Sequence, residues 1–219
     1  MWLQRFTDRA ALRLTLLGLA LAFSGCASNG PGSDSGERGR AEQSAAGDPR
    51  SAEVTPEALT MYEQAVAVMA AGDFLDAELR FKESLLQYPG YPGAYVNLAI
   101  IHVNNDSDAD AQAAVDAALA IDPDYAPALN QQGMLLRRNG KFLEAEAAYL
   151  KAVTASPDYA LAHYNLGVLN ELYLQRLDSA LQHFERYQQI VGDDEQVEKW
   201  ISDLQRRVAA SQRTANITE

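Results

Sequence analysis

Residues 126–159 read APALNQQGMLLRRNGKFLEAEAAYLKAVTASPDY, and their landmarks recur 34 residues before and 34 residues after. Each recurrence ends in a proline, one further residue and a tyrosine: Pro89-Gly90-Tyr91, Pro123-Asp124-Tyr125 and Pro157-Asp158-Tyr159. A fixed period of this length is typical of a stack of one supersecondary unit. Stacked repeats usually form a surface for another protein and seldom form a catalytic pocket. The period therefore favours a binding scaffold.

The pattern within residues 126–159 predicts two short helices joined by a turn at Asn139-Gly140. Small and apolar residues recur three or four positions apart, as one buried face of a helix requires. They are Leu129, Gly133 and Leu136 in the first helix and Phe142, Ala145, Tyr149 and Ala152 in the second. Pro157 then ends the unit.

This unit resembles the tetratricopeptide repeat (TPR), a helix pair with small residues at three places, aromatic residues at two and a proline near its end. The matching residues are Gly133, Ala145, Ala152, Phe142, Tyr149 and Pro157. Residues 58–91, 92–125 and 160–193 fit the pattern less closely. The resemblance implies an all-α fold, an α-solenoid of about four helix-turn-helix units within residues 53–193. A capping helix over residues 194–211 and a flexible tail over 212–219 are expected to follow.

Two units depart from the pattern. In residues 92–125, Asp108 stands where an aromatic residue is usual, which predicts a weak second helix. In residues 160–193, one extra residue lies between Glu171 and Arg176, and Tyr187 occupies a place that is normally small. We expect these two features of the last unit to mark partner-specific contacts or the docking of the terminal helix.

The start of the chain resembles the leader of a bacterial lipoprotein. An apolar run from Ala10 to Phe23 follows a basic start and is too short for a comfortable membrane span. It ends in Phe23-Ser24-Gly25-Cys26, which resembles the lipobox. The resemblance implies a signal peptide over residues 1–25 and acyl chains, palmitate among them, on Cys26. The alternative is an ordinary signal peptide with an incidental cysteine.

The residues after Cys26 indicate where the protein is held. Ala27 stands where an aspartate would retain a lipoprotein in the inner membrane, so the resemblance implies the periplasmic face of the outer membrane. Residues 26–52 are rich in glycine, serine and alanine and contain no bulky apolar residue. Such a segment cannot bury enough surface to offset its ordering entropy, which predicts a disordered linker.

Composition and motifs argue against several classes of function. The formal net charge of −12 disfavours nucleic acid, because phosphate contacts need clustered basic residues. The single cysteine excludes an intrachain disulfide and a thiolate zinc site. The sequence contains no phosphate loop, no nucleophile elbow and no histidine pair at metal-ligand spacing with a carboxylate. We therefore expect no catalytic residue, no metal and no cofactor; His102 and His163 should be packed and His183 exposed.

In TPR domains the first helix of each pair lines a concave groove. The resemblance implies that twelve residues line it here: Tyr62, Val66, Met69, Val96, Ile100, Asn104, Asn130, Met134, Arg137, Tyr164, Val168 and Glu171. This apolar, methionine-containing surface suits a peptide or an amphipathic helix. The alternative is that part of the surface packs against the chain's own terminal helix.

These observations predict a non-catalytic adaptor that is lipid-anchored in the cell envelope. Its partner would be a segment of an envelope complex, and similar lipoproteins serve TonB-type energy transduction, motility, pilus or secretion machinery. The membrane would be contacted through the lipid alone. Two alternatives stay open: a self-associating structural spacer, and an accessory factor to a cell-wall or polysaccharide enzyme.

Overall fold

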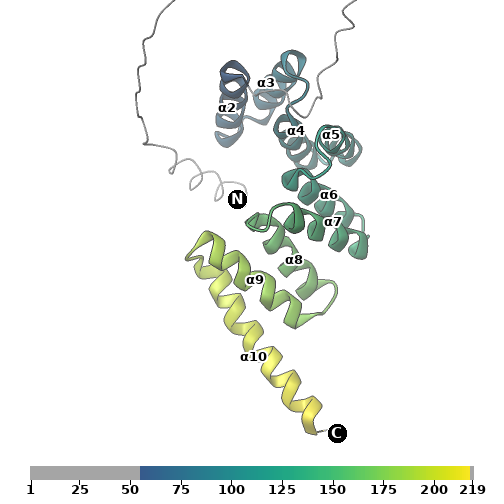
Figure 1. Cartoon of the computed structure of the whole chain (residues 1–219), viewed down its shortest axis with the longest axis vertical. Coiled ribbons are helices and arrows are strands. Elements are labelled where there is room, and N and C mark those ends of the chain that lie inside the picture. The colour runs from purple at the N-terminus through teal and green to yellow at the C-terminus, as the bar shows by residue number, and fades with distance from the viewer. Residues whose placement is uncertain (1–54, 218–219) are drawn as a thin grey trace, which may run out of the picture. The chain divides into compact units, whose positions relative to one another are not determined.

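The structure, a computed structural model, describes residues 55–217. These residues form nine helices and no strand (Figure 1). The helices are α2 (Pro56–Ala70), α3 (Phe74–Gln87), α4 (Pro92–Asn104), α5 (Asp108–Ile121), α6 (Ala126–Arg138), α7 (Phe142–Ala155), α8 (Ala160–Leu172), α9 (Leu177–Val191) and α10 (Glu195–Ile217). None of them is long and apolar enough to cross a membrane. The predicted signal peptide, Cys26 and the linker lie outside the described residues.

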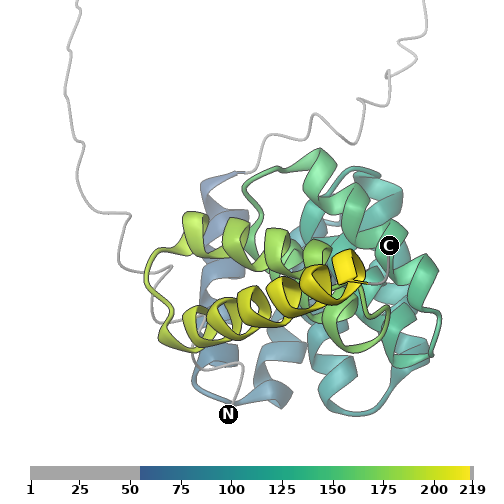
Figure 2. The same cartoon turned by 90° about the horizontal axis from the view of Figure 1, so that it is seen from below.

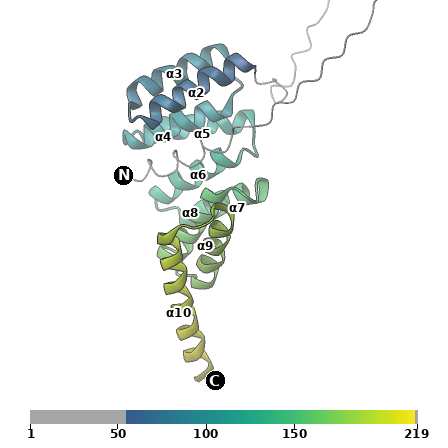
Figure 3. The ribbon, with the colours of Figure 1, turned by 90° about the vertical axis from the view of Figure 1, so that its left-hand side faces the viewer.

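The first eight helices form four consecutive pairs, α2 with α3, α4 with α5, α6 with α7 and α8 with α9 (Figure 3). Helices α4, α6 and α8 begin at residues 92, 126 and 160, in register with the repeat of the sequence. At the start of α2, the Thr55 hydroxyl accepts a hydrogen bond from the Ala58 amide at 3.2 Å, and Pro56 occupies the first turn. The all-α solenoid expected from the sequence is thus confirmed.

The turns inside the pairs share one backbone feature. Each contains a residue with positive φ, which lets the chain reverse within three or four residues: Gly72, Asp106, Gly140 and Gln175. Residues 71–73, 105–107 and 139–141 form the first three turns, whereas the fourth spans 173–176. The extra residue predicted in the last unit therefore lengthens its turn and leaves both helices intact.

The two helices of a pair approach most closely at a small residue. A Cβ atom added to Gly133 would lie 2.5 Å from the ring of Tyr149, and one added to Gly167 would lie 2.7 Å from Phe184. No real Cβ tolerates such distances, so glycine is required at both places. The corresponding place in α4 holds Ala99, which shares a buried cluster with Val115 of α5. In the first pair the corresponding place holds Ala65, which shares the same cluster with Phe81 of α3, so the contacts require glycine only in the third and fourth pairs.

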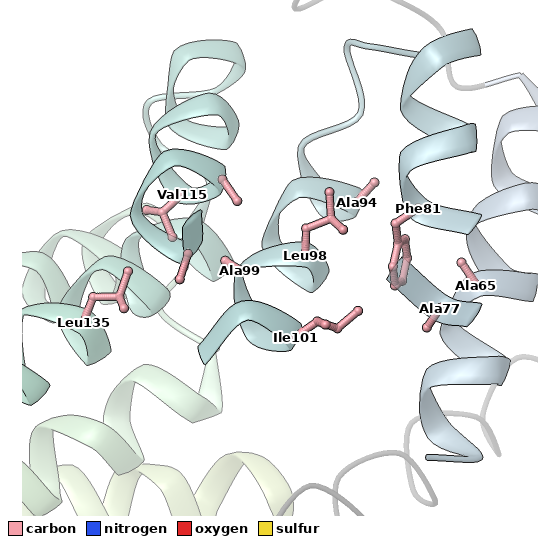
Figure 4. Close-up of a cluster of buried hydrophobic side chains, with 11 residues drawn as sticks. Ala65, Ala77, Phe81, Ala94, Leu98, Ala99, Ile101, Val115 and Leu135 are labelled. Atoms are coloured by element: carbon pink, nitrogen blue, oxygen red, sulfur yellow. The ribbon is translucent and has the colours of Figure 1, made fainter. Parts of the chain in front are cut away.

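The first two pairs share a continuous core, which also reaches α6 (Figure 4). Phe81 and Ile101 are fully buried in it, together with Val115 of α5. Helix α5 has 14 residues, as many as α3 and α7, so the prediction of a weak helix was wrong. Alanines at 111, 114 and 118 fit against α4 without an aromatic residue, and Asp108 and Asp110 lie in the first turn, where negative charge stabilises a helix.

Helix α10 packs along α9 (Figures 1 and 2). It continues to Ile217, beyond the predicted end at residue 211, because neither glycine nor proline interrupts it. Its cap is Asp194, directly before the helix: one carboxylate oxygen accepts from the amides of Gln196 and Val197 at 3.1 and 3.3 Å. The Tyr187 hydroxyl donates to the other oxygen at 3.3 Å. The unusual tyrosine thus serves the docking of the terminal helix.

A histidine pair joins α8 to α9. His163 Nδ1 lies 3.2 Å from His183 Nδ1, and His163 Nε2 lies 3.1 Å from the carbonyl oxygen of Pro157. A carbonyl can only accept, so Nε2 of His163 carries the proton and its Nδ1 accepts from His183. The expectation that His183 is exposed was wrong, because the ring of His163, 20 residues earlier, covers it.

We expect Gly133→Ala to destabilise the fold by about 1–3 kcal/mol, because Tyr149 must move to admit the methyl group. Urea unfolding followed by circular dichroism would measure the change. The control is the double variant Gly133→Ala/Tyr149→Val, which copies the Ala99 and Val115 pair. Its loss of unfolding free energy should be smaller than the sum of the losses measured for Gly133→Ala and for Tyr149→Val. Strict additivity would contradict the proposed steric constraint.

The histidine pair predicts a loss of stability in acid. Burial lowers the pKa of His183 to about 4, with a further contribution from His163, and burial also lowers the pKa of His163. Below pH 6.5 these histidines are protonated in the unfolded chain but stay neutral in the folded one. The free energy of unfolding therefore falls as the pH drops from 6.5 towards 4. We expect His183→Gln to flatten this slope by on the order of 1 kcal/mol, allowing for solvent at the half-buried ring.

Urea midpoints measured across this pH range would check the prediction. Gln182→Ala, at the exposed neighbouring position of α9, is the matched control and should leave the slope unchanged, because it removes no titratable group. If His183→Gln kept the pH slope of the unmodified protein, the histidine pair would not be the cause of the acid sensitivity, and the prediction would be contradicted.

Candidate protein-interaction surface

The first helices of the four pairs, α2, α4, α6 and α8, lie beside one another and form one surface, here called the A-helix face. Half-buried apolar side chains recur along it at 34-residue intervals: Val66, Ile100, Met134 and Val168. Each comes from the same place in its helix. The predicted groove residues therefore contain a regular apolar row, partly open to solvent.

A second set of predicted groove residues lies between the helices. Val96, Asn130 and Tyr164 are buried, with exposed fractions of 6%, 1% and 6%. The next helix of the A-helix face covers Val96 and Asn130, whereas α9 and α10 cover Tyr164, which sequence periodicity alone does not reveal. These three residues support the surface from within and are not available to a partner, so their assignment as partner contacts was wrong.

Polar side chains connect neighbouring helices of this face at a 35-residue offset. Asn97 donates to the Tyr62 hydroxyl at 2.9 Å, and Asn165 donates to the Asn130 side-chain oxygen at 2.9 Å. The corresponding residue in α6 is Gln131, whose counterpart at the same offset is the apolar Val96. The side-chain oxygen of Gln131 is buried and accepts no hydrogen bond within the described residues. The polar connection is therefore interrupted between the second and third pairs.

The helix α10 covers the last part of the A-helix face. The ring of Tyr164 contacts Tyr187 at a centroid distance of 5.3 Å and Trp200 of α10 at 6.0 Å. Val168 packs against the same cluster. Glu171 forms an ion pair with Arg207 of α10 at 2.6 Å. Within residues 55–217, α10 therefore covers the share of the face that belongs to the fourth pair, and no comparable terminal helix covers the first three pairs.

The remaining predicted residues lie in the open part. Tyr62, Val66 and Met69 are half-buried and pack on the core of the first two pairs, and Asn104 is exposed at the end of α4. Arg137 is half-buried on α6, near the phenol of Tyr149; burial raises the pKa of Tyr149 to about 12, and the positive charge of Arg137 partly offsets this.

The charges around α6 divide into paired and unpaired groups. Arg138 forms ion pairs with Asp106 and Asp108 at 3.2 and 3.1 Å, across the boundary between the second and third pairs. Within residues 55–217, Arg137 has no carboxylate within 4.0 Å. In the same residues, no group of three or more histidine, cysteine, aspartate or glutamate side chains could hold a metal ion.

Comparison with solved structures shows which folds are similar. The structure reported for functional characterization of PilF of Pseudomonas aeruginosa aligns with a TM-score of 0.62 and 21% identity, covering 70% of this chain and 69% of that chain. A thermophilic TPR protein of Thermus thermophilus aligns with a TM-score of 0.59 and 22% identity, covering 67% and 80%. MamA of Desulfovibrio magneticus aligns with a TM-score of 0.55 and 16% identity, covering 75% and 92%. At these identities the likeness concerns the fold.

Comparison with curated proteins gives no match. Two family models, both described as tetratricopeptide repeat, match residues 68–131 and 130–195. Together they span more than half of the chain and include the four turns, the Gly133 and Gly167 contacts and most of the open A-helix face. The chain belongs to the tetratricopeptide repeat family.

Proposed function

We propose that this protein is a non-catalytic adaptor that binds a peptide or helix of an envelope protein complex on its A-helix face. TPR proteins generally mediate protein–protein interactions and are typically non-catalytic. The observation that carries the proposal is the row of Val66, Ile100 and Met134. It is apolar, partly accessible, and not covered by another described element of the chain.

The row has the chemistry of a peptide-binding surface. Its members are aliphatic side chains and one methionine, whose flexible thioether adapts to the shape of a partner. Three half-buried apolar side chains at equal spacing can seat the anchors of an amphipathic helix or of an extended segment. Since α10 occupies the fourth pair, the partner would lie over the first three pairs.

The same proposal places the protein at the periplasmic face of the outer membrane. It rests on Cys26 at the end of the lipobox-like segment and on Ala27 after it. Each buried methylene of an acyl chain contributes about 0.8 kcal/mol, and two or more chains give stable anchoring. The net charge of −12 makes a second contact between the folded surface and anionic lipid unfavourable.

A photo-crosslinking residue at position 100 tests the surface. We expect in-cell crosslinking from Ile100 to capture one envelope protein, identified by mass spectrometry, because Ile100 lies in the open row. The matched control is position 86 on α3, where Leu86 is 86% exposed outside the A-helix face. Capture from position 86 alone would contradict the proposal. A product of twice the chain's own mass from position 100 would instead support the self-associating spacer.

The anchor is tested by Cys26→Ala. We expect this variant to leave the membrane fraction and appear in the soluble periplasmic fraction, because its acyl chains would be missing. Cell fractionation with immunoblotting measures the distribution, and Ser24→Ala, which keeps a small residue at that place, is the control. Unchanged sedimentation of Cys26→Ala with membranes would contradict lipidation.

A further inference from the structure

Four tyrosines from three repeats converge at one end of the A-helix face. Tyr91, Tyr125 and Tyr159 occupy the residues directly before α4, α6 and α8, and Tyr62 comes from α2. None of the first three caps its helix through its side chain. All four are half-buried. Their rings are therefore packed against the repeats and still reach solvent.

Contacts at Gly93, in the first turn of α4, show how close the rings come. Tyr62 and Tyr91 lie edge to face at a centroid distance of 4.8 Å. A Cβ atom on Gly93 would lie 3.3 Å from the Tyr125 hydroxyl and 3.4 Å from the Tyr62 hydroxyl. The phenol oxygens of Tyr62 and Tyr125, from different repeats, thus meet over the same residue. Burial raises the pKa of Tyr159, and Tyr125 and Tyr62 lie near enough to add to that rise. We call Tyr62, Tyr91, Tyr125 and Tyr159 the tyrosine cluster.

The phenols of the tyrosine cluster are neutral at physiological pH, and acidic side chains lie near them. Burial, then Tyr62 and Tyr91, then Asp122 raise the pKa of Tyr125 to about 12. Burial, Tyr62 and Glu63 raise the pKa of Tyr91. The phenols therefore stay protonated, and the carboxylates of Glu63 and Asp122 lie close enough to act on them.

These two carboxylates have no partner of opposite charge in the described part of the chain. No ion pair within 4.0 Å involves Glu63 or Asp122. In contrast, most described arginines are engaged elsewhere, for example Arg138 with Asp108 and Arg176 with Glu146. The faces of aromatic rings attract cations, and a nearby carboxylate strengthens that attraction.

We propose that the tyrosine cluster binds an arginine or lysine side chain of the partner segment, with Glu63 and Asp122 supplying the opposite charge. The proposal rests on the adaptor function and specifies its partner: a basic residue at the tyrosine cluster, followed by apolar residues over Val66, Ile100 and Met134. The charge complementarity extends to the whole chain, whose net charge is −12. An acidic segment would be repelled at this end of the face.

The test uses a fluorescently labelled peptide of alternating arginine and alanine, with a glutamate–alanine peptide of equal length as its counterpart. Fluorescence anisotropy with the full chain should show binding of the arginine peptide alone. Tyr91→Leu should weaken it by roughly tenfold through loss of the ring face, whereas Tyr91→Phe keeps the ring and should stay within about twofold. Circular dichroism confirms that each variant is folded.

Two matched controls separate the cluster from general attraction to an acidic protein. Tyr88→Leu removes a half-buried tyrosine outside the cluster, and Glu83→Gln removes an exposed carboxylate of α3. Neither should change the affinity, whereas Glu63→Gln should weaken it severalfold. Equal effects of Glu83→Gln and Glu63→Gln, or of Tyr88→Leu and Tyr91→Leu, would overturn the proposal, as would equal binding of the glutamate peptide.

The outcome is distinguishable from failure of the adaptor function. Capture of a protein from position 100 in cells, combined with no effect of Tyr91→Leu on the arginine peptide, would overturn the tyrosine proposal alone. Loss of peptide binding in Tyr91→Leu, combined with no capture from position 100, would support the basic-residue site and overturn the placement of the partner over the apolar row.

Discussion

The close approach of the two helices of a pair at a small residue sets the geometry of this protein. Gly133 faces the Tyr149 ring and Gly167 faces the Phe184 ring, with no room for a methyl group at either place. The first two pairs have alanine at the same place, Ala65 and Ala99, both fully buried. Since each pair is held at a small residue, the first helices of successive pairs come close enough to exchange side-chain hydrogen bonds. Asn165 with Asn130 and Asn97 with Tyr62 are the result.

The same geometry decides which part of the A-helix face is open. Residues such as Val96 and Asn130, one helical turn before the apolar row, are covered by the following helix. In the fourth pair no further repeat follows, and α10 takes that role through Trp200 and Arg207. Terminal elements of repeat stacks commonly cover an otherwise exposed end. The first three pairs therefore provide the accessible surface, and the fourth pair serves the docking of α10.

The sequence predicted the fold well and the surface in part. Its small residues, aromatic residues and turn glycines define helix faces and turns through spacings of three or four positions. Such spacings are visible in a short stretch of sequence. The row of Val66, Ile100 and Met134 was found because helical spacing repeats from unit to unit. Val96 and Tyr164 were misassigned as partner contacts because burial by neighbouring helices depends on the angle between helices. The position of Asp108 suggested a weak helix, yet alanines at the contact with α4 make an aromatic residue unnecessary.

By itself, the sequence determined the number and register of the helix pairs, because period, turn chemistry and small residues are local properties of a repeating unit. Only the tertiary structure decided which distant groups meet. His163 and His183 are 20 residues apart, and Tyr62 and Tyr125 reach the same glycine from different repeats. Such meetings depend on how neighbouring pairs are rotated and stacked. The features that give this scaffold its own chemistry, the histidine pair and the tyrosine cluster, arise at that level.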